Sequence, residues 1–114
     1  MRIQNNTQNT ILSSNAILAK SFFERARGLL GKSKLEDNEA LIIPQCPSIH
    51  MFFMKFAIDV IFADKACNVV GLVKNIKPFS LSTFFPRGYF AIELKAGTID
   101  ASGTKIGDVL SFEE

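Results

Sequence analysis

The residues best suited to chemistry are a histidine and two carboxylates that occur within apolar segments. His50 is the only histidine, Asp59 interrupts the run Ile58 to Phe62, and Glu93 lies in the alternating run Tyr89 to Lys95. A carboxylate in an apolar strand is costly unless cations or hydrogen-bond donors accompany it. A histidine paired with a carboxylate in a cleft can act as general acid or base. His50, Asp59 and Glu93 are therefore the candidate catalytic residues.

Cationic and aromatic residues extend these three into a candidate binding site. The partners available to Asp59 are Arg25, Arg27, Lys55 and His50. The alternative is a structural role, in which turn amides or an arginine compensate the charge of Asp59 and His50 is a core histidine. Perturbed ionisation alone does not identify a functional site, because structural ion pairs also perturb ionisation. The candidate binding residues are His50, Lys55, Asp59, Glu93, Arg25, Phe84, Phe85 and Arg87.

The two cysteines, Cys46 and Cys67, offer a nucleophile or metal ligands. Cys46 precedes His50 by four residues, which on an extended strand separates the two by about 13 Å, beyond hydrogen-bond reach. Only a tight turn at Pro47 and Ser48 would bring them together. The cysteines stand 21 residues apart, without the paired short spacings of zinc sites. The sequence therefore predicts inert thiols, no metal, no cofactor and a reducing compartment, which we expect to be the cytoplasm.

A twelve-residue connection from Lys77 to Gly88 carries three phenylalanines. Its length is typical of a functional or covering segment. A lid over the open end of the sheet is the first interpretation. A protein-binding patch is the second, because exposed rings rimmed by charge mark such surfaces. Rings beside Lys77 and Arg87 could also stack on bases, but the basic residues are too few for strong phosphate binding.

Length and composition restrict the partners further. The 114 residues suit one domain over positions 1–114, with 47% hydrophobic and 21% charged residues. The net charge of +2 is too small to imply nucleic acid or an anionic membrane. The amino terminus lacks the apolar core of a signal peptide, and no apolar run is long enough to span a bilayer. We expect a soluble monomer or weak dimer that binds an unknown small molecule or protein.

The pattern of apolar residues predicts one helix and several short strands. Ser21 and Glu24 form a capping box that starts a helix, and Gly31 can end it. Alternation over 50–56 predicts a central strand with two apolar faces, and alternation over 89–95 places Glu93 on the outward face. These elements predict an α+β domain, mostly antiparallel, as a curled sheet or small barrel closed by the helix. A polar edge segment at 1–15 contains one or two short strands, further strands are predicted at 40–43, 58–62, 69–73 and 109–112, and a helical turn is predicted at 98–102.

Several short blocks occur in a fixed order: Arg25 to Gly31, Ser48 to His50 leading into Met54 to Phe62, Ile92 to Gly97, and Gly107-Asp108. Together they resemble the small prokaryotic domain-of-unknown-function family 192, over about residues 16–112. The chain departs from the usual central block at Met51, Phe53, Lys55 and Ala57, where the family has Thr, Gly, Arg and Pro. A pocket at that strand would be more apolar or narrower. The resemblance implies a compact β-rich domain of a bacterial protein and carries no established activity.

These observations lead us to expect a non-enzymatic ligand- or protein-binding module. Its polar site would lie near His50, Lys55, Asp59 and Glu93, beside the aromatic connection. The alternative is a small hydrolase-type enzyme that uses His50 with Asp59 or Glu93 as acid and base. Strand register decides whether His50 and Asp59 meet, and register cannot be read from a single sequence.

Overall fold

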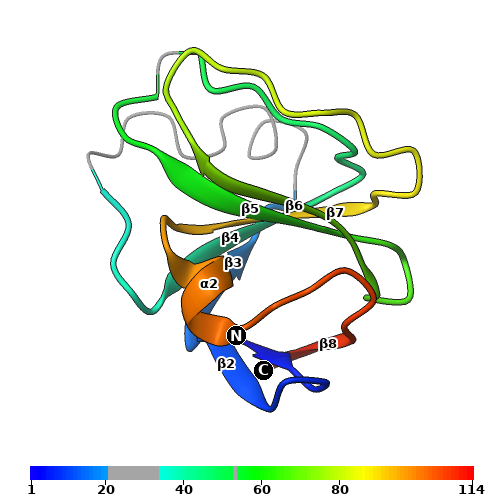
Figure 1. Cartoon of the computed structure of the whole chain (residues 1–114). Coiled ribbons are helices and arrows are strands. Elements are labelled where there is room, and N and C mark those ends of the chain that lie inside the picture. Colours follow the sequence, from blue (N-terminus) through cyan, green and yellow to red (C-terminus); the bar gives the residue numbers. More distant parts are fainter. Residues whose placement is uncertain (21–33, 53) are drawn as a thin grey trace.

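The computed structural model describes residues 1–20, 34–52 and 54–114. The helix predicted from Ser21 to Gly31, with Arg25, lies outside these ranges. The described strands form two sheets, and one short helix precedes the last strand (Figure 1). The elements are β1 (Arg2–Asn5), β2 (Thr10–Ser13), β3 (Asn15–Leu18), β4 (Glu39–Pro44), β5 (Ile58–Ala63), β6 (Val69–Ile76), β7 (Phe90–Lys95), α2 (Thr98–Ser102) and β8 (Leu110–Glu113).

The two sheets differ in size and in connectivity. The smaller has the order β2-β1-β8, so the first hairpin pairs with the last strand of the chain. The larger has the order β3-β4-β7-β5-β6, in which β3 and β4 are parallel and the other pairs are antiparallel. The α+β class with mainly antiparallel strands is therefore confirmed, whereas the described strands do not close into a small barrel. No helix in the described ranges is long and apolar enough to cross a membrane.

The larger sheet is buried on both faces, which explains its apolar strands. Every residue of β5 is buried, and β7 lies between β4 and β5. One face packs with Ile3 of the small sheet and Ile99 of α2. The other face packs with Ile49 and Met51, which come from a segment outside both sheets. Figure 1 shows the small sheet and α2 on one side of the large sheet and residues 45–52 and 77–88 on the other.

Most predicted elements occur within a few residues of their expected bounds. The strands at 40–43, 58–62, 69–73, 89–95 and 109–112 and the helical turn at 98–102 are all present. The polar amino-terminal segment forms β1 and β2, of which β2 is an edge strand.

The central strand predicted over 50–56 is wrong. Among the described residues, this stretch belongs to neither sheet, and only His50 forms an isolated antiparallel bridge, with Leu81. Alternation is nevertheless real, because Ile49 and Met51 are buried while His50 and Phe52 are exposed. The segment covers one face of the large sheet. Its side chains therefore alternate between the core and solvent, as the side chains of a half-buried strand do.

The outward position predicted for Glu93 is also wrong. Glu93 is only 6% exposed, because β7 is a central strand whose two faces are both covered. Alternation in a strand assigns residues to two faces, but it does not say whether the second face meets water.

The connection 77–88 is fastened to the large sheet by Phe85. The Phe85 ring lies 4.6 Å from the ring of Phe62, centroid to centroid. It also occupies the space above Gly71, where an added Cβ would lie 2.4 Å from Cε1 of Phe85. A residue larger than glycine at position 71 would therefore displace the ring.

We predict that Gly71→Ala lowers the free energy of unfolding by about 1–3 kcal/mol, the range for overpacked sites. Urea denaturation measures this loss. In a Phe85→Ala background the same substitution should cost little, because the clash is gone and the two effects are coupled. Additive losses in the double variant would show that Phe85 does not rest on Gly71.

Candidate functional site

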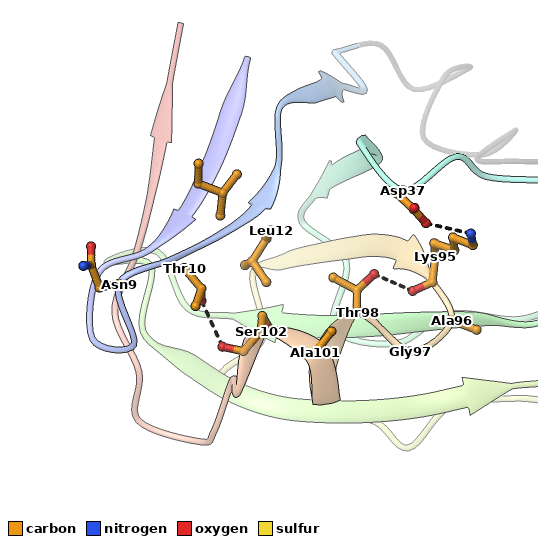
Figure 2. A pocket seen from close by; sticks show the side chains of 11 residues that line it. Asn9, Thr10, Leu12, Asp37, Lys95, Ala96, Gly97, Thr98, Ala101 and Ser102 are labelled. Carbon is orange, nitrogen blue, oxygen red and sulfur yellow. Dashed lines mark hydrogen bonds and ion pairs between the residues drawn. The ribbon is translucent and has the colours of Figure 1, made fainter.

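One hollow of the surface lies between β2, α2 and the turn that joins β7 to α2 (Figure 2). It has a volume of about 700 Å³. Polar groups on its wall are engaged with one another: Thr10 donates to the Ser102 carbonyl, Thr98 donates to the Lys95 carbonyl, and Lys95 pairs with Asp37 at 2.6 Å. None of the residues predicted from the sequence as site residues lines this hollow.

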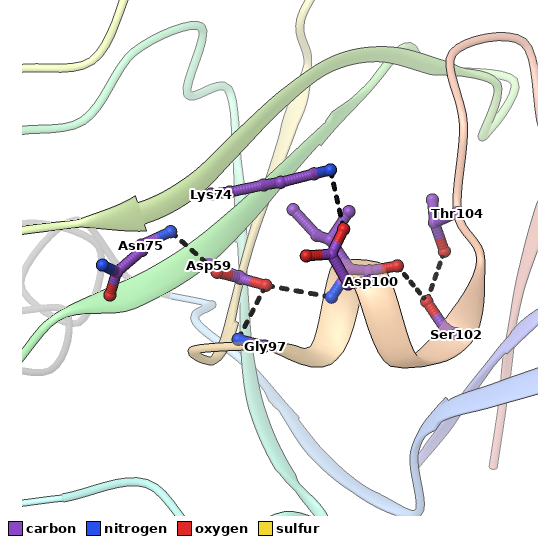
Figure 3. Close-up of polar contacts among 8 residues, drawn as sticks. Asp59, Lys74, Asn75, Gly97, Asp100, Ser102 and Thr104 are labelled. Atoms are coloured by element: carbon purple, nitrogen blue, oxygen red, sulfur yellow. Dashed lines mark hydrogen bonds and ion pairs between the residues drawn. The ribbon is translucent and has the colours of Figure 1, made fainter.

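Within the described residues, the hydrogen bonds to the Asp59 carboxylate all come from backbone amides (Figure 3). Its Oδ1 accepts a hydrogen bond from the Asn75 amide at 2.8 Å. Its Oδ2 accepts from the amides of Gly97 at 3.1 Å and Ile99 at 2.9 Å. Asp59 is 1% exposed. The geometry is that of the alternative in which turn amides satisfy this carboxylate.

These three hydrogen bonds fix two irregular pieces of backbone. Asn75 has φ 51° and Gly97 has φ 96°, both in the left-handed region. A left-handed residue costs free energy unless its surroundings hold it in place. Asp59 therefore ties the bend near the end of β6 and the start of α2 to the middle of the large sheet.

Glu93 is also a buried carboxylate, but unlike Asp59 it has few hydrogen-bond donors around it. Within the described part of the chain, its Oε1 has no hydrogen-bond donor. Register places Glu93 opposite Leu41 on one side and Val60 on the other. Burial raises the pKa of Glu93 to about 7. The Glu93 carboxyl group can therefore stay protonated, and so uncharged, up to nearly neutral pH.

The fold separates the predicted catalytic residues. Directly opposite residues in an antiparallel pair share a sheet face. Asp59 is opposite Leu94 and Glu93 is opposite Val60, so the two carboxylates lie on different faces of the large sheet. His50 is exposed on the segment that covers the Glu93 face. His50 therefore has the sheet between itself and Asp59, and the geometry gives the acid/base alternative no His50–Asp59 pair.

His50 instead belongs to a ladder between two loops. The Ser82 amide donates to the Ile49 carbonyl at 3.0 Å, and the Met51 amide donates to the Ser80 carbonyl at 2.8 Å. The Phe79 amide donates to the Met51 carbonyl at 2.7 Å, and His50 bridges Leu81. Residues 49–51 and 79–82 thus form a short antiparallel pair outside the sheets.

The outer side of this ladder carries large apolar side chains. His50 and Phe52 stack with ring centroids 5.2 Å apart. Phe52 is 41%, Phe79 65% and Leu81 68% exposed. The bridge puts Leu81 opposite His50, and Phe79 lies in the turn that leads into this ladder. We call His50, Phe52, Phe79 and Leu81 the paired-loop surface; Phe84, also exposed, lies three residues beyond Leu81.

Phe79 adopts an unusual backbone conformation within this surface, with φ 67°. A bulky residue in the left-handed region is an outlier whose cost is on the order of 1 kcal/mol or more. Such strain persists where the surroundings impose it, and it clusters at functional positions.

The remaining predicted binding residues divide into surface and core. Lys55 and Arg87 are exposed, whereas Phe85 packs against Phe62. Arg87 lines a second hollow of about 470 Å³ with Asp64 and Tyr89. The pKa of Asp64 is lowered chiefly by the hydrogen bond that its carboxylate accepts from the Asn68 amide, with a further contribution from the charge of Arg87.

Both cysteines are free thiols. Cys46 Sγ donates a hydrogen bond to the Ser48 carbonyl at 3.1 Å, and burial raises the pKa of Cys67. Over residues 1–20, 34–52 and 54–114, no three His, Cys, Asp or Glu side chains gather as metal ligands would. A raised thiol pKa means less thiolate at neutral pH, which fits an inert cysteine.

Sequence reasoning missed Phe52 and Leu81 as surface residues. Phe52 was assigned to a central strand, and Leu81 is a common core residue. The available signal was that 45–57 and 77–88 both combine apolar residues with prolines, which disfavour sheet interiors.

Comparisons with known proteins agree with this fold. The model of domain-of-unknown-function family 192, described as Uncharacterized ACR, matches residues 3–112, so the resemblance of the ordered blocks is confirmed. A UPF0127 protein from Thermococcus sibiricus is 35% identical over 115 residues, which cover 96% of this chain and 73% of that protein. This relative is archaeal, so a bacterial source stays a prediction.

Two solved structures share the architecture. A protein of unknown function from Novosphingobium aromaticivorans DSM 12444 has a TM-score of 0.85 and 21% identity, with 98% of this chain and 84% of that chain covered. A protein from Sinorhizobium meliloti 1021, whose description proposes a transcription regulator, has a TM-score of 0.81 and 20% identity, with 96% and 89% covered. At these identities the likeness concerns the fold alone.

We predict that Asp59→Ala lowers the free energy of unfolding by about 3 kcal/mol, because three backbone amides lose their acceptor in a buried place. Urea denaturation gives the value. Asp100→Ala is the matched control: it removes only the exposed Lys74–Asp100 ion pair, 2.7 Å long, and should cost less than about 1 kcal/mol. Equal losses in the two variants would contradict a structural role specific to Asp59.

We predict that Glu93 makes the protein less stable as pH rises. Its pKa is about 7 when folded and 4.5 when unfolded, so the folded state binds the proton more tightly. The penalty is absent below about pH 4.5, grows up to about pH 7 and reaches about 3 kcal/mol above that.

Glu93→Gln keeps the shape of the side chain and removes the charge. The difference in free energy of unfolding between this variant and the wild type should therefore increase with pH over the same window. Glu113→Gln, which removes only the largely exposed ion pair with Arg2, is the control and should change the free energy of unfolding by less than about 1 kcal/mol. A flat difference for Glu93→Gln would mean that Glu93 is not buried as a neutral acid.

Proposed function

We propose that this chain, which belongs to the Uncharacterized ACR family, is a non-enzymatic binding module that docks another protein on the paired-loop surface. The observation that carries the proposal is the alternation in the ladder between residues 49–51 and 79–82. The inner side chains of Ile49 and Met51 are buried in the core, whereas the outer side chains of the ladder face solvent. The predicted polar site contributes His50 to this surface, while Asp59 and Glu93 lie in the sheet beneath.

Large exposed side chains on a braced scaffold are what a protein interface requires. Aromatic rings supply much contact area with few rotatable bonds, and they are enriched at the centres of interfaces. The backbone beneath the rings is held by hydrogen bonds of 2.7–3.0 Å between the two loops. Ile49 and Met51 anchor one loop, and Phe85 anchors the other. Binding would therefore cost little conformational entropy in the two loops, and a low entropy cost favours affinity.

Protein recognition suits this surface better than small-molecule recognition does. Small ligands favour concave sites that enclose most of their surface. The hollow at β2 and α2 and the hollow at Asp64 do not include His50, Phe52, Phe79 or Leu81. As part of the proposal, the protein is a monomer or weak dimer in the cytoplasm. Two free thiols fit the reducing environment of that compartment.

A random linear peptide library displayed on phage tests the proposal. We predict that wild-type protein enriches peptides whose binding is lost in the Phe52→Ser/Leu81→Ser variant. Ile106→Ser is the matched control, because Ile106 is 59% exposed but lies outside the paired loops, and it should leave binding unchanged. Far-ultraviolet circular dichroism checks that all variants fold. If no peptide depends on Phe52 and Leu81, the docking function is wrong.

A further inference from the structure

We propose that the partner of the paired-loop surface is an acidic peptide segment, which combines aspartate or glutamate with large apolar residues. This inference rests on the docking function proposed above and adds the chemistry of the partner. It follows from the distribution of charge along the chain and from the ion pairs that the described residues form.

The two segments that bear the exposed rings carry basic residues and no acidic ones. Residues 45–57 and 77–88 contain Lys55, Lys77 and Arg87 and neither an aspartate nor a glutamate. The whole chain has 13 Lys and Arg and 11 Asp and Glu. Removing the three cations leaves ten basic and eleven acidic residues, so the rest of the chain has a net charge of −1. The two segments themselves therefore have a net charge of +3.

Lys55 and Lys77 also differ from three other lysines in their pairing. Lys34, Lys74 and Lys95 each meet a carboxylate within the described structure, at 3.0, 2.7 and 2.6 Å. In the same part of the chain, Lys55 and Lys77 form no ion pair.

Lys55 follows Phe52 by three residues, and Lys77 precedes Phe79 by two. These two ammonium groups are therefore free to meet carboxylates beside the rings. Arg87 contributes less, because Asp64 partly offsets its charge.

A protein segment fits this combination better than other acidic partners. Stable adsorption to anionic lipid usually takes a cluster of about four to eight basic residues, and these segments carry three. Sequence-independent binding to nucleic acid draws on many phosphate contacts. A peptide needs only a few carboxylates for specificity, since apolar contacts supply most of the affinity.

The peptides enriched in the phage experiment test the chemistry directly. We expect acidic and apolar residues together, and negative net charge, in the peptides whose binding depends on Phe52 and Leu81. A synthetic peptide of the most enriched sequence, titrated against the full chain by calorimetry, gives the dissociation constant. Lys55→Ser/Lys77→Ser should weaken binding about tenfold, the sum of two modest charge interactions.

A matched control variant separates local from general electrostatics. Lys34→Ser/Lys105→Ser removes the same charge from exposed positions outside the paired loops, and it should change the dissociation constant less than twofold. Raising the salt concentration should weaken wild-type binding and leave the Lys55→Ser/Lys77→Ser variant nearly unaffected, because salt screens exposed charges.

The outcomes distinguish this inference from the docking function. Enriched peptides that depend on Phe52 and Leu81 but are neutral or basic, or that ignore the loss of Lys55 and Lys77, overturn the acidic partner and leave docking intact. Tighter binding to phosphatidylserine vesicles or to an oligothymidine strand than to any enriched peptide also overturns it. Absence of any peptide that depends on Phe52 and Leu81 overturns both.

Discussion

The buried Asp59 carboxylate is the interaction on which the arrangement of the large sheet depends. It accepts hydrogen bonds from three backbone amides and, among the described residues, forms no ion pair, so aligned amides are the main compensation of its charge. Charge-assisted hydrogen bonds of this kind are stronger than neutral ones. Because the donors come from β6, from Gly97 before α2 and from Ile99 within α2, one side chain holds together pieces that are separate in the sequence. A residue that looks catalytic by type thus serves as an internal scaffold.

Glu93 lies on the other face of the same sheet and has the opposite energetic role. The burial that stabilises its neighbours Leu41 and Val60 penalises a charged carboxylate. The sheet therefore contains one carboxylate that strengthens it and one that weakens it above neutral pH. The two differ in how many donors surround each one, which is a property of the three-dimensional fold.

Much of the fold could be predicted from the sequence, because local patterns of apolar residues and glycines mark the strands and α2. The strand Ile58 to Ala63 is a compact apolar run, and Gly97 and Gly103 mark the ends of α2. The place of residues 50–56 could not be predicted, because alternation looks the same in a sheet and in a covering loop. The burial of Glu93 could not be predicted either, since it requires knowing that β7 is central. The pairing of His50 with Leu81 depends on contacts across 31 residues, which no local pattern encodes.

The alternation within the paired loops has a consequence for which substitutions the fold tolerates. Ile49 and Met51 hold the loops to the core, and His50, Phe52 and Leu81 have few contacts with it. Substitutions at the outer positions therefore have little effect on folding, and substitutions at the inner positions leave the outer surface chemically unchanged. The inner and outer positions of the same short stretch therefore meet separate demands, those of the core and those of the surface.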